Sequence, residues 1–381
     1  MKVSKFFSIV AALATAAMSL SSCSDDKFDP SIFPEGGDEL DPNSVTYKFD
    51  KWLQQTYLTP YNLDFRYKMQ DVGADMNYNL VPAEYDKAVD LAILTNYLWF
   101  EAYKEVVDEE FLKMYGPRII HLIGSSALNP SSGTEILGLA EGGIKVSLFK
   151  VNFLNVSDFN NLNEMYFKTM HHEFAHILHQ TKSYPTEFNL VSNGLYDDNN
   201  WQDRQESMLR SKGFITNYAS SQTREDFAET IANYIVKTDE QWASYMKDAN
   251  RGWETPTPTE GTDVEPDATY YCFYYYNNNQ SGDENKQYAP ESVVVEKEED
   301  GKIVYYHKTL KDDKKNPIRI YPCEDKDGID GEAVILRKVN IARVWLRDEF
   351  GVDLDQLREV VQRRQSSYDI NALRKQIEDI Q

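Results

Sequence analysis

Four of the six histidines of this chain fall within nine residues, at His171, His172, His176 and His179. His172 and His176 are four residues apart, so on a helix their imidazoles lie one above the other on the same face. Two imidazoles placed in this way can bind one divalent ion at about 2.0–2.1 Å, the usual zinc–nitrogen distance. Glu173 completes the pattern His-Glu-x-x-His, in which the carboxylate takes a proton from a water molecule held by the metal. The segment therefore predicts a zinc centre for hydrolysis.

A catalytic zinc takes three protein ligands and leaves its fourth position to water, so this pair needs a third partner. His179 is seven residues from His172, about 10 Å along a helix, which is too far for the same ion. The metzincin motif needs Gly at position 179 and His at position 182, where this chain has His179 and Lys182. We expect the third ligand from another helix, and we expect His179 to lie in the cleft or to bind a carboxylate. His171 is expected to point away from the ligand face, and His121 to be an ordinary core histidine.

The best source of a third ligand is the acidic segment that follows Tyr218. Glu225 and Glu229 are four residues apart, a like-charge spacing that destabilises a helix by a few tenths of a kcal/mol unless a positive charge lies opposite. A zinc ion with its imidazoles is such a charge. An exposed acidic face, common in an acidic protein, is the alternative. Thr223 followed by Asp226 is typical of a capping box at the start of this helix.

These residues must be positioned by helices and strands that the hydrophobic pattern also indicates. The histidine segment has an apolar stripe that would bury its helix, formed by Phe167, Met170, Phe174, Ile177 and Leu178. We expect helices over residues 82–107, 162–180, 202–211, 223–247 and 332–380, the last interrupted near Gly351. We expect strands over residues 59–69 and 118–124, and a hairpin within residues 133–152. Strands first and helices afterwards is an α+β arrangement.

The two motifs together resemble a known group of metallopeptidases. His-Glu-x-x-His, followed some fifty residues later by Tyr-x6-Glu-x3-Glu, is similar to the gluzincin metallopeptidases of the anthrax lethal factor type. More of the chain, over roughly residues 45–250 and 331–370, resembles the zinc-binding metallopeptidases known as substrate-import-associated zinc metallohydrolase lipoproteins. The resemblance implies a zincin-like α+β fold with Glu225 as the third zinc ligand. It also implies that Tyr218 faces the reacting carbonyl.

On this basis we expect Zn²⁺ to be bound by His172, His176 and Glu225, with Glu173 as the general base. Tyr218 is expected to donate a hydrogen bond to the oxyanion. Glu229 is the candidate second partner that orients a ligand imidazole, and Asp226 is a weaker candidate for that role. The strands within residues 133–152 would offer an edge to an extended peptide or protein substrate.

The N-terminus reads as an export signal rather than as part of the fold. Residues 1–22 carry Lys2 and Lys5 before an apolar run too short to span a bilayer as a permanent helix. The run ends in Leu-Ser-Ser-Cys, which resembles the lipobox of bacterial lipoproteins, with Cys23 as the lipidated residue. Residues 23–50, rich in Asp, Glu and Pro, are expected to be an acidic tether. We expect a lipid-anchored outer-membrane protein exposed at the cell surface, with the periplasmic side as the alternative, and a glycan-import complex as a candidate partner.

The composition limits the remaining classes of function. A formal net charge of −22 disfavours nucleic-acid binding. Three cysteines are too few for a cysteine-ligated zinc domain. Residues 251–330 are rich in Tyr and Asn and predict a β-rich insert between a catalytic region at 51–250 and C-terminal helices at 331–381, which we expect to pack on it. Within the insert, Cys272 and Cys323 are as well explained by a disulfide as by separate thiols.

Two other functions remain open at this stage. The Tyr-rich run at residues 270–276 would suit a non-catalytic lipoprotein that binds glycan or peptide in a nutrient-import system, although strands favour aromatic residues in any case. A zinc amidase or deacetylase is the other, since the same activated water attacks any acyl group.

Overall fold

The computed structural model describes most of the chain. The described residues are 40–69, 80–128, 135–136, 138–141, 145–204, 206–254, 269–276, 286–299, 301–311, 314–315, 317–320 and 329–380. Residues up to Tyr47 form one unit and Lys48–Gln381 a second, much larger one. In the described part of the first unit, the backbone N–H of Ser44 donates to the carbonyl of Asp41, forming a turn. All functional residues discussed below belong to the second unit, except Cys23.

Between Tyr47 and Tyr115 the described residues are mainly helical. Its helices are α2 (Tyr47–Leu53), the π-turn η1 (Gln54–Leu58), α3 (Thr59–Tyr61), α4 (Tyr85–Thr95), the π-turn η2 (Asn96–Phe100), α5 (Glu101–Val106) and α6 (Glu109–Tyr115). The run from α4 through α5 confirms the helix expected over residues 82–107. The strand expected over residues 59–69 is wrong in its first part, because Pro60 lies in the first turn of a short helix that ends at Asn62 with φ 51°. Only β1 (Asp64–Arg66) is extended.

A small mixed sheet lies behind the helices that carry the site. Its strand order is β1, β2 (Ile119–Leu122), β6 (Lys145–Leu148) and β5 (Gly138–Glu141). The first three strands are parallel, with Ile120 opposite Val146, and β5 runs antiparallel to β6 at the edge of the sheet. The strand at 118–124 and the hairpin within 133–152 are thus confirmed. Two short strands, β3 (Ala127–Leu128) and β4 (Glu135–Ile136), pair with each other.

The middle of the chain contains the helices that the histidine and glutamate motifs require. They are η3 (Val151–Phe153), α7 (Phe159–Leu162), the π-turn η4 (Asn163–Phe167), α8 (Lys168–Thr181), α9 (Phe188–Val191), η5 (Trp201–Asp203), α10 (Glu206–Arg210), η6 (Tyr218–Ser220), α11 (Thr223–Val236) and α12 (Asp239–Ala249). The single helix expected over residues 223–247 is in fact two. It breaks because Thr238 caps α12 and forms a capping box with Gln241.

The remaining elements are an all-antiparallel sheet and three terminal helices. The sheet comprises β7 (Arg251–Glu254), β8 (Thr269–Tyr276), β9 (Lys286–Glu299), β10 (Lys302–Lys311) and β11 (Pro317–Ile320), in the order β11-β10-β9-β8-β7, as expected of a β-rich insert. The helices are α13 (Gly331–Phe350), α14 (Leu354–Ser367) and α15 (Ile370–Glu378). Gly351, at φ 70°, ends α13 at the interruption that the sequence predicts. The proposed Cys272–Cys323 pairing lies outside the described side chains.

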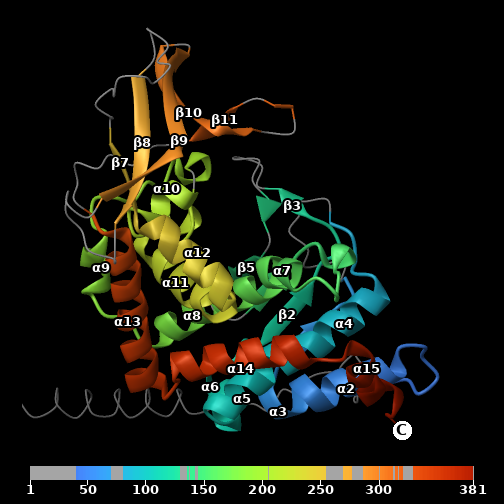
Figure 1. Ribbon diagram of the computed structural model, residues 1–381. Coiled ribbons are helices and arrows are strands. Elements are labelled where there is room, and N and C mark those ends of the chain that lie inside the picture. The colour runs from blue at the N-terminus through green and yellow to red at the C-terminus, as the bar shows by residue number, and fades with distance from the viewer. Residues whose placement is uncertain are drawn as a thin grey trace, which may run out of the picture. The chain divides into compact units, whose positions relative to one another are not determined.

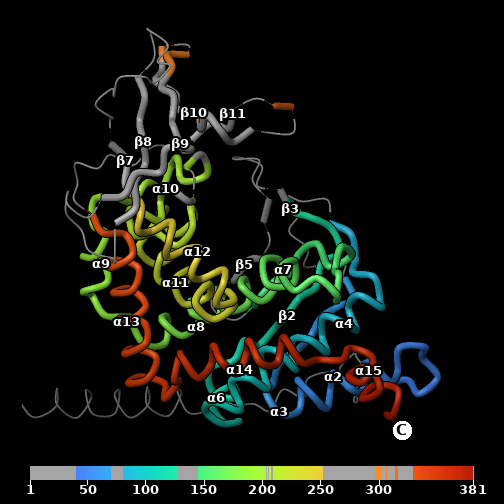
Figure 2. Tube along the Cα trace, viewed as in Figure 1, coloured from blue at the N-terminus to red at the C-terminus, as the bar shows by residue number. Residues whose placement is uncertain are grey.

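The helix pair α8 and α11 forms the centre of the molecule's larger unit, and the two helices lie side by side (Figure 1). The two long C-terminal helices, α13 and α14, both pack against α11, and α14 also contacts α5 (Figure 2). The helices of residues 331–380 therefore pack on the helices of the preceding region rather than forming a separate domain. Together with the small sheet they make the α+β fold that the sequence predicts.

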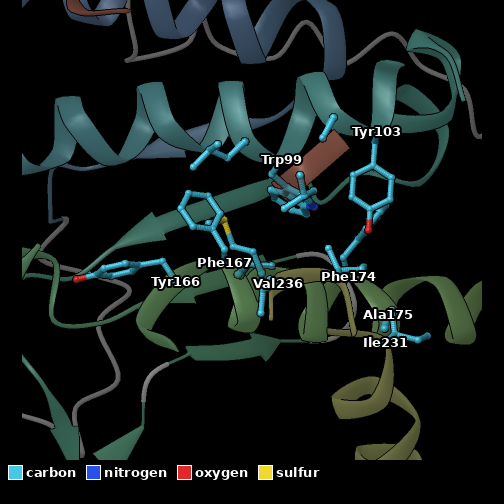
Figure 3. Packing of buried hydrophobic residues seen from close by; sticks show 14 of the residues in the cluster. Trp99, Tyr103, Tyr166, Phe167, Phe174, Ala175, Ile231 and Val236 are labelled. Carbon is cyan, nitrogen blue, oxygen red and sulfur yellow. The ribbon is translucent and has the colours of Figure 1, made fainter. Parts of the chain in front are cut away.

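The core is most densely aromatic between α8 and the helix that runs from α4 to α5. Phe174 of α8 lies between Trp99 and Tyr103, at ring-centroid distances of 5.5 and 5.1 Å (Figure 3). The whole apolar stripe of the histidine segment is buried, as expected. Helix α8 also packs against α11, and Ala175 of α8 and Ile231 of α11, both labelled in Figure 3, are buried. Helix α8 is thus held on both sides, which fixes the direction of its histidine face.

Candidate metal centre

The two histidines of the His-Glu-x-x-His pattern converge, as their spacing on α8 predicts. Nε2 of His176 lies 3.0 Å from Nε2 of His172, and the two rings are nearly perpendicular. His172 is buried and His176 is slightly more exposed. The two nitrogens therefore point at a common position next to the helix.

Glu225, in the first turn of α11, brings a carboxylate to the same position. Its Oε2 atom lies 3.2 Å from Nε2 of His172 and 3.0 Å from Nε2 of His176. Among the residues that the structure describes, these three form the only group of His, Cys, Asp or Glu that could hold a metal ion. The segment after Tyr218 is therefore the source of the third group, and its acidic face is not turned to solvent.

The donor triangle fits a zinc ion. Atoms bound tetrahedrally at about 2.0–2.1 Å from one zinc ion lie about 3.3–3.4 Å apart. The three observed separations are 3.0, 3.0 and 3.2 Å, close to this value. Two imidazoles and one carboxylate are also a donor set found at catalytic zinc, with a fourth position free.

Glu229, one turn further along α11, contacts the outer side of His172. Its Oε1 atom lies 2.9 Å from Nδ1 of His172, and its Oε2 atom accepts hydrogen bonds from Thr216 at 2.7 Å and Asn233 at 3.2 Å. Burial disfavours the protonated imidazole of His172 and so lowers its pKa. The hydrogen bonds to Glu225 and Glu229 outweigh this effect and raise the pKa of His172 to about 10 in the metal-free protein. The imidazoles of His172 and His176 in turn hold the pKa of Glu225 well below its usual range, despite burial. Glu229 thus contacts the imidazole of His172, the kind of contact that its predicted role as an orienting partner requires.

The hydrogen-bonding neighbour described for His179 is an imidazole, not the carboxylate that was one of the two alternatives expected. Nε2 of His179 is 2.7 Å from Nδ1 of His176, three residues earlier on the helix. Burial lowers the pKa of His179 to about 4. His171 does point away from the ligand face and lies with Nδ1 3.1 Å from the Tyr103 hydroxyl, and burial lowers its pKa to about 3. His121 is buried in β2, as expected of a core residue.

Glu173 and Tyr218 both lie beside the triangle. Glu173 is only 9 % exposed, and burial raises the pKa of its carboxyl. The ring centroid of Tyr218 is 5.8 Å from that of His172, and Trp201 packs against the other part of the Tyr218 ring at 4.8 Å. Burial, followed by the nearby Glu225 carboxylate, raises the pKa of Tyr218 well above its usual range. Without a metal ion Tyr218 therefore keeps its hydroxyl hydrogen at neutral pH.

Comparison with known proteins agrees with this geometry. Residues 43–355 match the model of the family described as "Putative zinc-binding metallo-peptidase". The chain belongs to this family. It is also similar to a solved structure, the crystal structure of a putative zinc-binding metallo-peptidase from Bacteroides caccae, with 31% sequence identity and a TM-score of 0.57. That match covers 85% of this chain and 94% of the other, and no protein of curated function shows significant similarity.

In this member of the zinc-binding metallo-peptidase family, the partners of Asp226 differ from those expected. It does not cap α11, whose N-cap is Gln222 and whose first helical residue is Thr223. Its Oδ2 atom instead lies 2.5 Å from Nζ of Lys338, from α13, and accepts a hydrogen bond from the hydroxyl of Tyr196 at 2.8 Å. Both charged groups are fully buried, and burial raises the pKa of Asp226 while lowering that of Lys338. Asp226 therefore holds α13 to the helix that carries Glu225, and none of the hydrogen bonds described for it reaches a ligand imidazole.

The metallo-peptidase site includes one cation that its sequence did not single out. Nε of Arg224 lies 3.0 Å from Oε1 of Glu225, the carboxylate oxygen that does not face the histidines. Most of the Arg224 side chain is exposed. Arg224 stands out in the sequence as the only basic residue between Thr223 and Val236. Nothing in the sequence indicates, however, that its side chain points toward Glu225. The Arg224 guanidinium thus donates to the oxygen of Glu225 that does not face the histidines.

Proposed function

We propose that this protein is a zinc-dependent peptidase whose centre is formed by His172, His176 and Glu225. The observation that supports this most directly is the convergence of three donor atoms from two separate helices, 3.0–3.2 Å apart, at a buried position. Membership of a zinc-binding metallo-peptidase family supports the same conclusion. A bound zinc ion supplies a water molecule of lowered pKa and polarises the scissile carbonyl.

The neighbouring side chains supply the proton transfers and the orientation that peptide hydrolysis needs. Glu173 accepts the proton of the attacking water and returns it to the leaving amine; its raised pKa brings the carboxyl closer to working pH, as a general base requires. Tyr218 donates its hydroxyl hydrogen to the oxygen of the scissile carbonyl as negative charge develops there. Glu229 accepts the Nδ1 hydrogen of His172 and so turns Nε2 of that ring toward the ion.

An extended substrate has a strand edge available to it. Strand β5 is the last strand of its sheet and runs antiparallel to β6. The backbone groups on its outer side can pair with a peptide by strand addition. Strand β5 also contacts α8, the helix that carries the histidines, so a peptide on this edge lies near the proposed centre. The same chemistry serves other acyl groups, so an amidase or deacetylase is the alternative that the substrate assay must separate.

We further propose that the protein is held at the outer membrane by lipid on Cys23, with the acidic residues that follow as a tether. The predicted end of this tether at residue 50 is wrong, because Tyr47–Leu53 form α2 and Phe49 is fully buried. Cys23 lies outside the described residues, so the support is the sequence alone. In the part of the chain that the structure describes, no helix is long and apolar enough to cross a membrane. Association with a glycan-import complex remains part of this proposal. Metabolic labelling with a palmitate analogue tests it, with Cys23→Ala as the unlabelled control.

The test of the catalytic proposal is metal content together with cleavage. The purified protein is expected to contain one zinc ion per chain and to cleave an unfolded protein such as reduced casein. A chelator is expected to abolish cleavage, and added zinc to restore it. Cleavage that survives complete metal removal contradicts the proposal. Stoichiometric zinc with hydrolysis of N-acetylated glycans but not of peptides supports the deacetylase alternative instead.

A further inference from the structure

His176 has a hydrogen-bonding partner on each side of its ring. Its Nε2 atom belongs to the donor triangle, and its Nδ1 atom lies 2.7 Å from Nε2 of His179. The two ring centroids are 5.0 Å apart and the ring planes are nearly perpendicular. The pair is three residues apart on α8, a spacing at which side chains of one helix face meet.

Metal binding determines which ring nitrogen carries the proton in His176 and in His179. When Nε2 of His176 binds a metal ion through its lone pair, the proton of that ring is on Nδ1. This N–H then donates to the lone pair on Nε2 of His179. His179 must therefore carry its own proton on Nδ1. The two ligand imidazoles thus have different acceptors, a carboxylate for His172 and an imidazole for His176.

His179 is held in place from outside the histidine face. The ring of Tyr184 packs edge-on against it at 5.5 Å. Tyr184 in turn stacks on Phe227 of α11 at 4.6 Å, with the two rings inclined by 21°. Phe227 is two residues from Glu225, the third member of the triangle. A row of aromatic contacts thus links the position of His179 to the helix that carries the carboxylate.

From these contacts we propose that His179 is a positioning residue of the metal centre, which accepts the Nδ1 hydrogen of His176 and holds that ring toward the ion. The proposal rests on the metal ligation part of the proposed function and is independent of the reaction catalysed. Ligating histidines need such an acceptor, and losing one typically weakens metal binding about 10–100-fold. His179 contributes through the orientation of His176 and does not itself reach the ion.

The test compares three substitutions of His179 by zinc affinity, measured by competition with a chromophoric chelator. In His179→Gln the side-chain oxygen reaches about as far as Nε2 and can still accept, so zinc affinity is expected to stay near that of the wild type. His179→Asn is polar but too short, and His179→Leu has no acceptor. Both are expected to bind zinc about 10–100-fold more weakly. Gln180→Leu, at the exposed neighbouring position, is the matched control and is expected to change nothing.

Two further measurements separate the outcomes. Circular dichroism of each metal-free variant shows whether it is folded, and the Asn and Gln pair keeps the comparison valid if the Leu variant is not. The visible spectrum of the cobalt-loaded protein is expected to shift in the Asn and Leu variants and to be unchanged in the Gln variant. Wild-type affinity in the Asn and Leu variants overturns the proposal, and so does an equal loss in the Gln variant. A wild-type protein that binds no zinc at all contradicts the proposed function itself.

Discussion

Oε2 of Glu225 lies 3.0 Å from Nε2 of His176, although 49 positions separate the two residues in the chain. Two buried helices, α8 and α11, are needed to create this contact, and each is held by packing on its other faces. The contact therefore follows from the way the two helices pack against each other.

The first prediction concerns the carboxylate of this pair. Glu225→Gln keeps the shape of the side chain but removes the charged donor, so zinc affinity is expected to fall by more than the 10–100-fold typical of an outer partner. Equilibrium dialysis with zinc measures this loss. Glu240→Gln, an exposed glutamate of α12, is the control and is expected to bind zinc as the wild type does. Unchanged zinc affinity in Glu225→Gln is incompatible with the proposed ligand set.

The second prediction separates metal binding from proton transfer. Glu173→Gln is expected to retain one zinc ion per chain, because Glu173 is not part of the donor triangle. Cleavage of casein is expected to fall about 10²–10⁴-fold, the contribution of a general base. Measuring zinc content and the initial rate on the same sample makes the distinction. A Gln variant that cleaves at the wild-type rate shows that another group takes the proton.

The third prediction assigns Tyr218 to the transition state. Tyr218→Phe keeps the aromatic contacts with His172 and Trp201 and removes only the hydroxyl. We expect kcat to fall about 10²–10³-fold, as for other oxyanion donors, with little change in KM or zinc affinity. Steady-state kinetics on a fluorogenic peptide provide the test. An increase in KM alone contradicts this role and indicates a contact with bound substrate instead.

Much of this centre could be predicted from the sequence, since local spacing determines it. The facing of His172 and His176 follows from helical periodicity. The same rule puts Glu225 and Glu229 on one face of α11, and the resemblance to known metallopeptidases implied that Glu225 is the third ligand. The positions of His179, Arg224 and Asp226 could not be predicted in this way. The direction of each depends on which atoms other helices bring near it, and for Asp226 the partner is 112 positions away. The break at Thr238 was missed because a capping box interrupts a pattern that remains apolar on both sides.

The fourth prediction is that zinc binding releases a proton. In the metal-free protein the pKa of His172 is raised to about 10, so the imidazole is protonated at neutral pH. Because this folded-state pKa lies above the ordinary value of about 6.5, the charged ring stabilises the metal-free fold fully below pH 6.5. That contribution is lost as the pH rises through 10. Zinc needs the neutral ring, so we expect its apparent affinity to rise about tenfold per pH unit between pH 7 and 9.

Isothermal titration calorimetry in buffers of different ionisation enthalpy measures the protons directly. About one proton per zinc ion is expected to be released at pH 8. A binding constant that does not change with pH contradicts the assignment of His172 as a protonated ligand. His172→Gln, which removes the titrating ring, is expected to lose both the affinity and the proton release.

The fifth prediction concerns the buried ion pair between Lys338 and Asp226. Lys338→Met leaves the Asp226 carboxylate without its cation in a fully buried place, so we expect a loss of about 3–5 kcal/mol in the free energy of unfolding. Urea unfolding in the presence of a chelator measures the fold without any contribution from metal. The double variant Lys338→Met with Asp226→Leu removes both charges and is expected to regain most of the loss. A single variant as stable as the wild type shows that the carboxyl is satisfied by Tyr196 alone.

The same ion pair can form only late in synthesis, because its two residues are far apart in the chain. Lys338 is made more than one hundred residues after Asp226, and the whole antiparallel sheet of β7 to β11 is translated between them. A nascent or truncated chain that stops before α13 has the Asp226 carboxyl in the first turn of α11 without the Lys338 ammonium that pairs with it. Such fragments are expected to be degraded by cellular proteases, so the proposed metal centre becomes stable only after α13 has been synthesised.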